Sequence, residues 1–367
     1  MGGAERMFIN IAKHWDMMGV NFRVIEPEPR LFSKSSRVPT LVRSNTSWSD
    51  VIHGLLFNVL LIPMALTIRG FSVVLACNNH ILSLLPAVLL SRLKRKPCIV
   101  IVHHYDIMDG ENLSTSLFGI FKIARRMGYG RPYSLLKAFV IKMAIIMARS
   151  CEATICVSEV FAKLFPNSFL SSNGVDLSLI DSVGGGEKEY DACFVGRLDL
   201  KKGILDLLQV WEIVVSTIPS AKLALIGHDQ IGIDKFIHDY GLGDNVTYLG
   251  VLSDKRMYEI VKRSKVFITM STAEGWGIAI AEALACGIPV VCCKIKTLYE
   301  QWKNCPYVFF TKPNNVRDAA DKVIEVLGLS NKSFLRIREC VKDLDWKNVA
   351  LVTAEIVENI KKKYSNQ

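Results

Sequence analysis

The strongest constraint on the fold lies in residues 266–293, where two apolar segments flank a glycine-rich turn and a short helix. Val266–Met270 and Pro289–Cys293 have the composition of buried strands. Glycines let the backbone approach a ligand closely, and the helix start offers N–H groups and the positive end of a dipole. The stretch therefore predicts an α/β fold with a phosphate-binding turn at one edge of its sheet.

Two glutamates occupy this otherwise apolar stretch. Glu274 lies in the turn, and Glu282 follows about two helical turns later. Both can face the carboxyl edge of the sheet, where α/β folds bind ligands. Either the two acids bind a ligand there, or Glu274 is simply exposed and Glu282 lies on the solvent face of the helix.

The run Glu274–Gly277, followed by Ala281–Val291, resembles the paired-glutamate signature of the retaining glycosyltransferases of GT-B fold, family 4. The resemblance extends over residues 2–346. It implies two Rossmann-like domains that face each other across a cleft. It also implies transfer of a sugar from a nucleotide-diphosphate sugar to an acceptor hydroxyl, with retention of configuration at the sugar.

The resemblance further implies roles for individual residues. Glu282 would accept hydrogen bonds from ribose hydroxyls of the donor, and Glu274 would hold hydroxyls of the donor sugar at the catalytic centre. The loop that holds Gly250 and Val251 would contact the nucleotide base. The backbone that would contact the diphosphate belongs to Gly275, Trp276, Gly277 and Ile278.

A second group of charged residues follows the apolar segment 191–195. Arg197 carries a forked, permanently charged donor, and Lys202 carries a compact charge. They form either a solvated charge cluster or a site that neutralises a diphosphate. The resemblance implies the second role for both, while Lys201 lies one place off the pattern. No metal or other cofactor is then expected.

The segment Lys294–Thr297 departs from the small loop that the family has at this place, although Glu300 corresponds to a glutamate that follows it. This departure leaves the identity of the donor sugar open.

The chain opens directly on a glycine turn at residues 2–3, without the strand that should precede it in a doubly wound domain. We expect an additional strand upstream of the recorded start; the alternative is a sheet that lacks its first strand. In the family the turn faces the donor, so Gly3 would let the chain approach it.

His103 ends a strand and is the better match to a histidine that faces the donor sugar, with His104 as the alternative. Otherwise either residue is an ordinary loop histidine.

Alternating strands and helices fill the rest of the chain. Residues 27–45 are polar and basic and are expected to form a loop, and Ser158 is expected to cap a helix. The strands are expected at 21–26, 72–77, 98–103, 153–157, 191–195, 222–227, 246–249, 266–270 and 289–293. The helices are expected at 50–68, 81–93 and 346–363, with others between the later strands.

The sequence predicts three parts. Residues 1–172 would form the acceptor-side domain, and residues 173–345 would form the domain that binds the nucleotide sugar. The boundary is placed at the turn signal Asn173–Gly174. Residues 346–367 would form a helix that packs back on the first domain.

The formal charge of +10 and the pI of about 9.0 predict anionic partners. Residues 111–150 combine basic and apolar side chains. They form either amphipathic helices with a solvated face or a surface that docks on anionic lipid, which would suit a lipid-linked acceptor. Residues 51–68 are apolar, but they contain polar residues and a proline, so we expect a buried helix rather than a membrane span. Nothing resembles a nucleic-acid-binding module.

The ten cysteines show no metal-binding spacing, and most lie in apolar segments. We expect reduced, buried thiols and a cytoplasmic protein, peripheral on the inner face of a membrane if the basic surface docks there. The alternative to an active glycosyltransferase is a catalytically silent GT-B-like subunit that binds a nucleotide or a partner. The absence of the first strand favours this alternative.

Overall fold

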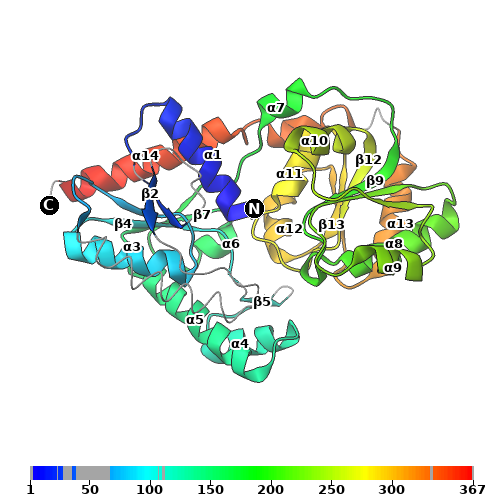
Figure 1. The fold of residues 1–367 in the computed structure, drawn as a ribbon. Helices are drawn as coiled ribbons and strands as arrows, with labels where there is room; N and C mark the ends of the chain where they lie inside the picture. Colours follow the sequence, from blue (N-terminus) through cyan, green and yellow to red (C-terminus); the bar gives the residue numbers. More distant parts are fainter. Residues whose placement is uncertain are drawn as a thin grey trace. The chain divides into compact units, whose positions relative to one another are not determined.

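The computed structural model describes residues 3–22, 24–27, 35–38, 67–105, 107–109, 112–330 and 334–365 (Figure 1). The chain divides into two compact units. Unit 1 consists of Met1–Asp109, Leu113–Ser172 and Trp346–Gln367. Unit 2 consists of Gly110–Asn112 and Asn173–Asp345. Each unit is described by itself.

Unit 1 is built on a parallel sheet of four strands in the order β3-β4-β7-β8. All five side chains of β4 are buried, as expected for a strand covered on both faces by helices. The strands are β3 (Val74–Ala76), β4 (Cys98–Val102), β7 (Ala153–Cys156) and β8 (Ser168–Leu170). The helices are α1 (Gly3–Met17), α3 (Ile81–Lys94), α4 (Leu117–Arg126), α5 (Arg131–Arg149), α6 (Glu159–Ala162) and α14 (Trp346–Ser365).

The last helix packs on the first one within unit 1. The indole Nε1 of Trp15 on α1 donates a hydrogen bond to the Ala350 carbonyl of α14 at 2.9 Å. On the same helix, the Thr353 hydroxyl lies 3.1 Å from that of Ser171. The helix expected at the end of the chain is therefore confirmed, and it belongs to unit 1.

The first part of unit 1 departs from the expectation in one place. β1 (Val24–Pro27) pairs in parallel with β2 (Ser35–Val38), a segment we expected to be a loop. A polar four-residue strand has no apolar alternation, and its pairing depends on a neighbour, so the sequence gives no local signal for it. Two further short strands are β5 (Met108–Asp109) and β6 (Asn112–Leu113). The helix expected at 50–68 lies almost entirely outside the described residues.

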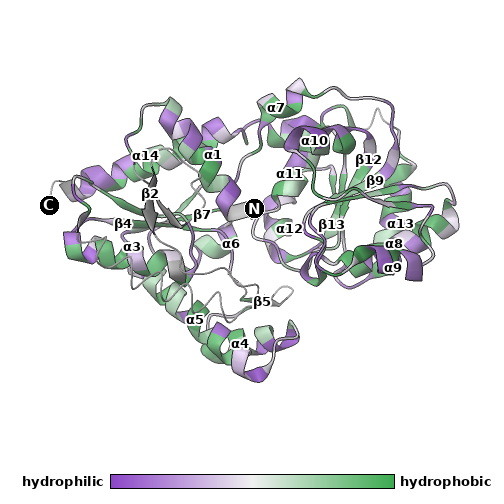
Figure 2. Cartoon of the chain, viewed as in Figure 1, coloured by the Kyte–Doolittle hydropathy of each residue, from purple (hydrophilic) through white to green (hydrophobic). Residues whose placement is uncertain are grey.

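Unit 2 contains a parallel sheet of six strands in the order β11-β10-β9-β12-β13-β14. The strands are β9 (Tyr190–Val195), β10 (Leu223–Ile226), β11 (Val246–Tyr248), β12 (Ser264–Thr269), β13 (Val290–Cys293) and β14 (Val308–Thr311). The order reverses between β9 and β12, which makes this the topological switch point of a doubly wound sheet. Figure 2 shows hydrophobic residues along the strands and hydrophilic ones on the outer faces of the helices.

Helices lie on both sides of this sheet (Figure 1). They are α7 (Leu177–Ser182), α8 (Ile204–Thr217), α9 (Ile233–Asp239), α10 (Asp254–Lys262), α11 (Ile278–Ala285), α12 (Lys296–Trp302) and α13 (Val316–Leu327). Two 3₁₀ helices are η1 (Leu200–Lys202) and η3 (Ile337–Val341). The strand–turn–helix–strand unit expected at 266–293 is confirmed as β12, α11 and β13.

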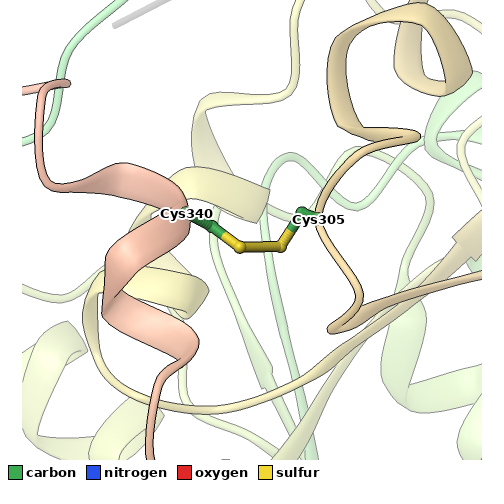
Figure 3. Close-up of a disulfide and its surroundings, with 2 residues drawn as sticks. All are labelled: Cys305 and Cys340. Carbon is green, nitrogen blue, oxygen red and sulfur yellow. A yellow bond between two sulfur atoms is a disulfide. The ribbon is translucent and has the colours of Figure 1, made fainter.

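A disulfide joins Cys305, before β14, to Cys340 on η3 (Figure 3). Our expectation that all ten cysteines are reduced thiols is wrong for this pair. The two residues lie 35 positions apart in the sequence, and only folding brings their Cα atoms to 5.8 Å. Because disulfides persist mainly in oxidising compartments, this bond does not support the cytoplasmic location, which stays a prediction.

Within the residues that the structure describes, no helix combines the length and the apolar character that a membrane crossing requires.

Candidate functional site

The candidate site lies at the switch point of unit 2, where the loops after β9 and β12 leave the same edge of the sheet. These strands pair in parallel, with Val266 opposite Ala192, so their carboxyl ends lie side by side. The first loop carries Arg197 and Lys202, and the second carries Glu274. Ligands of open α/β sheets bind at this place because neighbouring loops diverge there.

The fold brings Lys202 and Glu274 together across 72 residues of sequence. The Lys202 Nζ lies 2.5 Å from the Glu274 Oε1, and each side chain keeps about a fifth of its surface exposed. This partial burial strengthens the charge–charge attraction relative to bulk water, while leaving both groups accessible to a ligand.

Backbone contacts fix the two loops against each other. The Lys201 carbonyl accepts hydrogen bonds from the Thr272 N–H at 3.2 Å and from its hydroxyl at 3.4 Å. Gly203 has a φ of 65°, and a Cβ at this position would overlap the carbonyl oxygen of Met270. A glycine is therefore required for Lys202 to lie this close to the end of β12.

Side chains of α12 hold the glycine-rich turn in place through hydrogen bonds to its backbone. The Thr297 hydroxyl donates to the Glu274 carbonyl at 2.7 Å, and the Trp302 Nε1 donates to the Trp276 carbonyl at 3.1 Å. The indoles of Trp276 and Trp302 meet edge to face at 5.2 Å. Trp276 is buried, so its side chain anchors the turn, and only its backbone could contact a ligand.

The helix α11 begins directly after this turn. Gly277 forms its N-cap with a φ of 91°, and a Cβ there would lie 2.8 Å from the Leu298 side chain. The first N–H groups of a helix have no intrahelical acceptors, so the N–H of Ile278, together with the turn N–H groups of Gly275–Gly277, is suited to bind an anion.

Glu282 is buried in the middle of α11, which excludes the interpretation that it lies on the solvent face. Its Oε1 accepts a hydrogen bond from the buried Tyr258 hydroxyl of α10 at 2.8 Å. Burial of a carboxylate is costly unless donors satisfy it, and Tyr258 supplies one such donor.

Arg197 is the most exposed of the charged candidates, with 58% of its side-chain surface accessible. Its Nη2 lies 3.4 Å from the Asp199 Oδ2, while the Asp199 Oδ1 accepts the Lys202 N–H at 2.9 Å. Asp199 therefore both restrains Arg197 and caps η1, which presents Lys202.

Gly250 and Val251 follow β11 on the other half of the sheet. The Gly250 carbonyl accepts the Gly227 N–H at 2.8 Å, which ties this loop to the one after β10. Val251 is highly exposed and accessible to a ligand.

Two expected site residues belong to unit 1. Gly3 is the first residue of α1. His103 follows β4 and is buried, with its Nε2 at 3.1 Å from the Cys77 carbonyl, so this nitrogen carries the proton. Burial lowers the pKa of His103 to about 4, which keeps the ring neutral at pH 7. The Asn79 side chain accepts the His103 N–H at 2.9 Å and donates to the His104 carbonyl at 2.8 Å.

Sequence reasoning missed three residues that support the site of unit 2, namely Tyr258, Thr297 and Trp302, and it missed Asn79, which contacts His103 in unit 1. Each acts through a contact with a distant segment, and none belongs to a motif that a single sequence displays. Among the described residues, no group of three or more His, Cys, Asp or Glu side chains is arranged to hold a metal ion.

Comparison with known proteins identifies two family models that match successive parts of the chain. "Glycosyltransferase Family 4" matches residues 1–179, and "Glycosyl transferases group 1" matches residues 179–339. A curated relative from Xanthomonas campestris, GDP-mannose:cellobiosyl-diphosphopolyprenol alpha-mannosyltransferase, is 23% identical over 56% of this chain and 57% of its own. The alpha-monoglucosyldiacylglycerol synthase of Acholeplasma laidlawii is 28% identical over 38% of this chain and 35% of its own. The chain thus spans roughly a third to a little over half of the length of these relatives.

Solved structures show the same fold along nearly the whole chain. HepE of Anabaena, crystallised with UDP and glucose, superposes with a TM-score of 0.72 at 17% identity, covering 98% of this chain and 96% of its own. Sucrose-phosphate synthase of Thermosynechococcus elongatus gives a TM-score of 0.70 at 17% identity, covering 89% of this chain and 83% of its own.

Proposed function

Because the chain belongs to the glycosyltransferases of family 4 and GT-B fold, we propose that it transfers a sugar from a nucleotide-diphosphate sugar to an acceptor hydroxyl. The observation that carries this proposal is the ion pair between Lys202 and Glu274 at the switch point of unit 2. The pair would supply a cation for the diphosphate beside an acid for the sugar hydroxyls.

In this mechanism the departing diphosphate is the group that needs stabilisation. Cleavage of the bond between the sugar and the phosphate leaves negative charge on the phosphate oxygens. Lys202, Arg197 and the N–H groups that begin α11 would stabilise this charge, and fixed donors of this kind lower a barrier by a few kcal/mol each. The protein cations would take the place of a metal ion.

Donor binding would then rearrange the resting ion pair. The diphosphate would compete with Glu274 for Lys202, which releases the carboxylate to accept hydrogen bonds from hydroxyls of the sugar. The hydrogen bond from Thr297 keeps the backbone of Glu274 in place during this exchange. Glu282, oriented by Tyr258, would accept hydrogen bonds from the ribose.

We further propose a retaining reaction, in which the acceptor attacks from the face that the diphosphate leaves and a phosphate oxygen helps to take its proton. His103 would act near the donor sugar as a neutral ring that accepts a hydrogen bond at Nδ1, since its Nε2–H already donates to the Cys77 carbonyl and its pKa lies near 4. The names of two relatives contain lipids, diphosphopolyprenol and diacylglycerol. This supports a glycan or lipid-linked acceptor here.

The test is a panel of UDP- and GDP-sugars in a thermal-shift assay, followed by a transfer assay with the sugar nucleotide that raises Tm. A ligand that binds only the folded protein raises its Tm, so a true donor stands out. The expected product keeps the anomeric configuration of the donor by NMR. Binding without turnover for every acceptor tried would instead favour the catalytically silent subunit. The absence of any shift across the panel would remove the proposal.

A further inference from the structure

The helical hairpin α4–α5 of unit 1 is a surface that the proposed reaction does not use. Within this hairpin α4 packs on α5, and Ile120, Ile123 and Ala124 of α4 are buried. The Lys142 Nζ donates to the Thr115 carbonyl at 3.0 Å and ties the base of α4 to α5. The hairpin is therefore a defined element of the fold, and in Figure 1 α4 lies at its far end from the sheet of unit 1.

Several large apolar side chains of this hairpin are exposed. Phe118 is 65% exposed, Leu135 is 56% exposed and Phe139 is 55% exposed. Leu117 and Ile146 are exposed as well. A soluble surface seldom carries so many exposed apolar side chains on one element, and such a patch marks a binding surface.

A groove of about 440 Å³ opens between α4 and the start of α5. It is lined by Leu117, Phe118, Phe121, Arg131, Pro132 and Leu135. Five of these six side chains are apolar, and the sixth is a cation. A groove of this composition fits a hydrocarbon chain that carries an anionic group.

The charge of the hairpin has a single sign. Between Leu113 and Cys151 the sequence has seven Lys and Arg residues and no Asp or Glu. Lys122 lies over the Phe118 ring at 4.5 Å from its centroid, and Lys137 lies over the Tyr129 ring at 4.3 Å. The cations thus lie against the apolar residues, and their long side chains can reach head groups while their stems stay in apolar surroundings.

We propose that the α4–α5 hairpin docks the protein on an acidic phospholipid bilayer, with Phe118, Leu135 and Phe139 inserted among the acyl chains and the cations at the phosphate level. A bilayer supplies both the hydrocarbon and the dense negative charge that this surface matches, and basic amphipathic helices bind to it in this way. A nucleic acid offers no hydrocarbon for the exposed side chains. The proposal does not depend on which sugar is transferred.

The experiment is co-sedimentation of the full chain with vesicles of phosphatidylcholine alone or with added phosphatidylglycerol. Tight binding is expected only with the acidic vesicles, and salt should weaken it because it screens exposed charges. The double variant Phe118→Ser/Leu135→Ser and the charge variant Lys122→Gln/Arg126→Gln should each bind at least about tenfold more weakly. The matched control is Leu335→Ser in unit 2, which removes an apolar side chain that is 83% exposed and should leave binding unchanged.

Three outcomes would overturn the proposal. They are equal binding to neutral and acidic vesicles, undiminished binding by both hairpin variants, and a dimer in light scattering that the same variants dissociate. The Tm shift by sugar nucleotides, measured on the same variants without lipid, reports on the fold and on the site of unit 2. A loss of vesicle binding with an unchanged shift therefore separates this proposal from the proposed function.

Discussion

Lys202 Nζ lies 2.5 Å from Glu274 Oε1, and this ion pair joins the loops that follow the two central strands of the sheet of unit 2. Each partner comes from a loop whose backbone is fixed by a separate contact. The Thr272 N–H donates to the Lys201 carbonyl, and the Thr297 hydroxyl donates to the Glu274 carbonyl. The pair is therefore preorganised, and its two members should respond differently to mutation.

Glu274→Gln keeps the size of the side chain but removes the charge that would hold the sugar hydroxyls and compete for Lys202. We expect transfer to slow about a hundredfold, the typical loss on removal of one electrostatic contact in an active site. The affinity for the nucleoside diphosphate alone should stay the same or increase, because the Glu274 carboxylate no longer competes for Lys202. Steady-state kinetics measure the transfer rate and calorimetry measures the affinity. Transfer at the parent rate would contradict the assignment.

Thr297→Val removes the hydroxyl that holds the backbone of Glu274. Stability should fall by about 1 kcal/mol, the usual value of one hydrogen bond, and transfer should slow about tenfold as the turn loses its position. Thr311→Val is the matched control, since this equally buried hydroxyl donates to the Cys292 carbonyl in the sheet. It should lower stability similarly and leave transfer unchanged. Equal kinetic losses in both variants would show that Thr297 has no special role.

The bond between Cys305 and Cys340 should leave eight of the ten cysteines open to alkylation in the denatured, unreduced protein. Closing a loop between residues 35 apart stabilises a fold by about 3–4 kcal/mol in the chain-entropy view. A reducing agent should therefore lower the Tm of the parent but not that of Cys340→Ser. Mass spectrometry counts the alkylated thiols, and ten labelled cysteines before reduction would show that the bond is absent.

Burial of the His103 ring should make the stability of the protein depend on pH. The ring has a pKa of about 4 in the folded protein and its ordinary value of 6.5 in the unfolded chain, because burial disfavours the charged form. Between these values only the unfolded chain binds the proton, so stability present above pH 6.5 is lost as the pH falls toward 4. The loss amounts to about 3 kcal/mol. The free energy of unfolding can be measured by urea titration at several pH values between 4 and 7. It should depend less steeply on pH in His103→Gln, whose amide can still donate to Cys77, than in the parent. An equal dependence on pH in both proteins would refute this prediction.

The sequence predicted the elements whose signals are local. β10, β12 and β13 are short apolar runs bounded by turn residues, and the Ser158 cap follows from a hydroxyl directly before a helix, where it accepts the Val160 N–H at 3.2 Å. β2 and the disulfide escaped prediction because each depends on a partner elsewhere in the chain.

The same distinction applies to the candidate site. Its charged residues could be named from the motif that contains Glu274 and from the resemblance that it carries. Their supports could not, since Tyr258 reaches Glu282 from another helix and Thr297 reaches Glu274 only through the packing of α12. Such contacts arise from tertiary structure and leave no periodic pattern.

The central claim is that Lys202 binds the diphosphate of the donor, and calorimetric titration of the nucleoside diphosphate tests it most directly. Lys202→Gln should weaken binding about tenfold or more, because a hydrogen bond between charged groups contributes about 1.5–3 kcal/mol. Lys265→Gln makes the same charge change on β12, where Lys265 pairs with Asp191 at 2.7 Å outside the proposed site, and should leave the affinity unchanged. Equal affinities of the parent and Lys202→Gln would contradict the account.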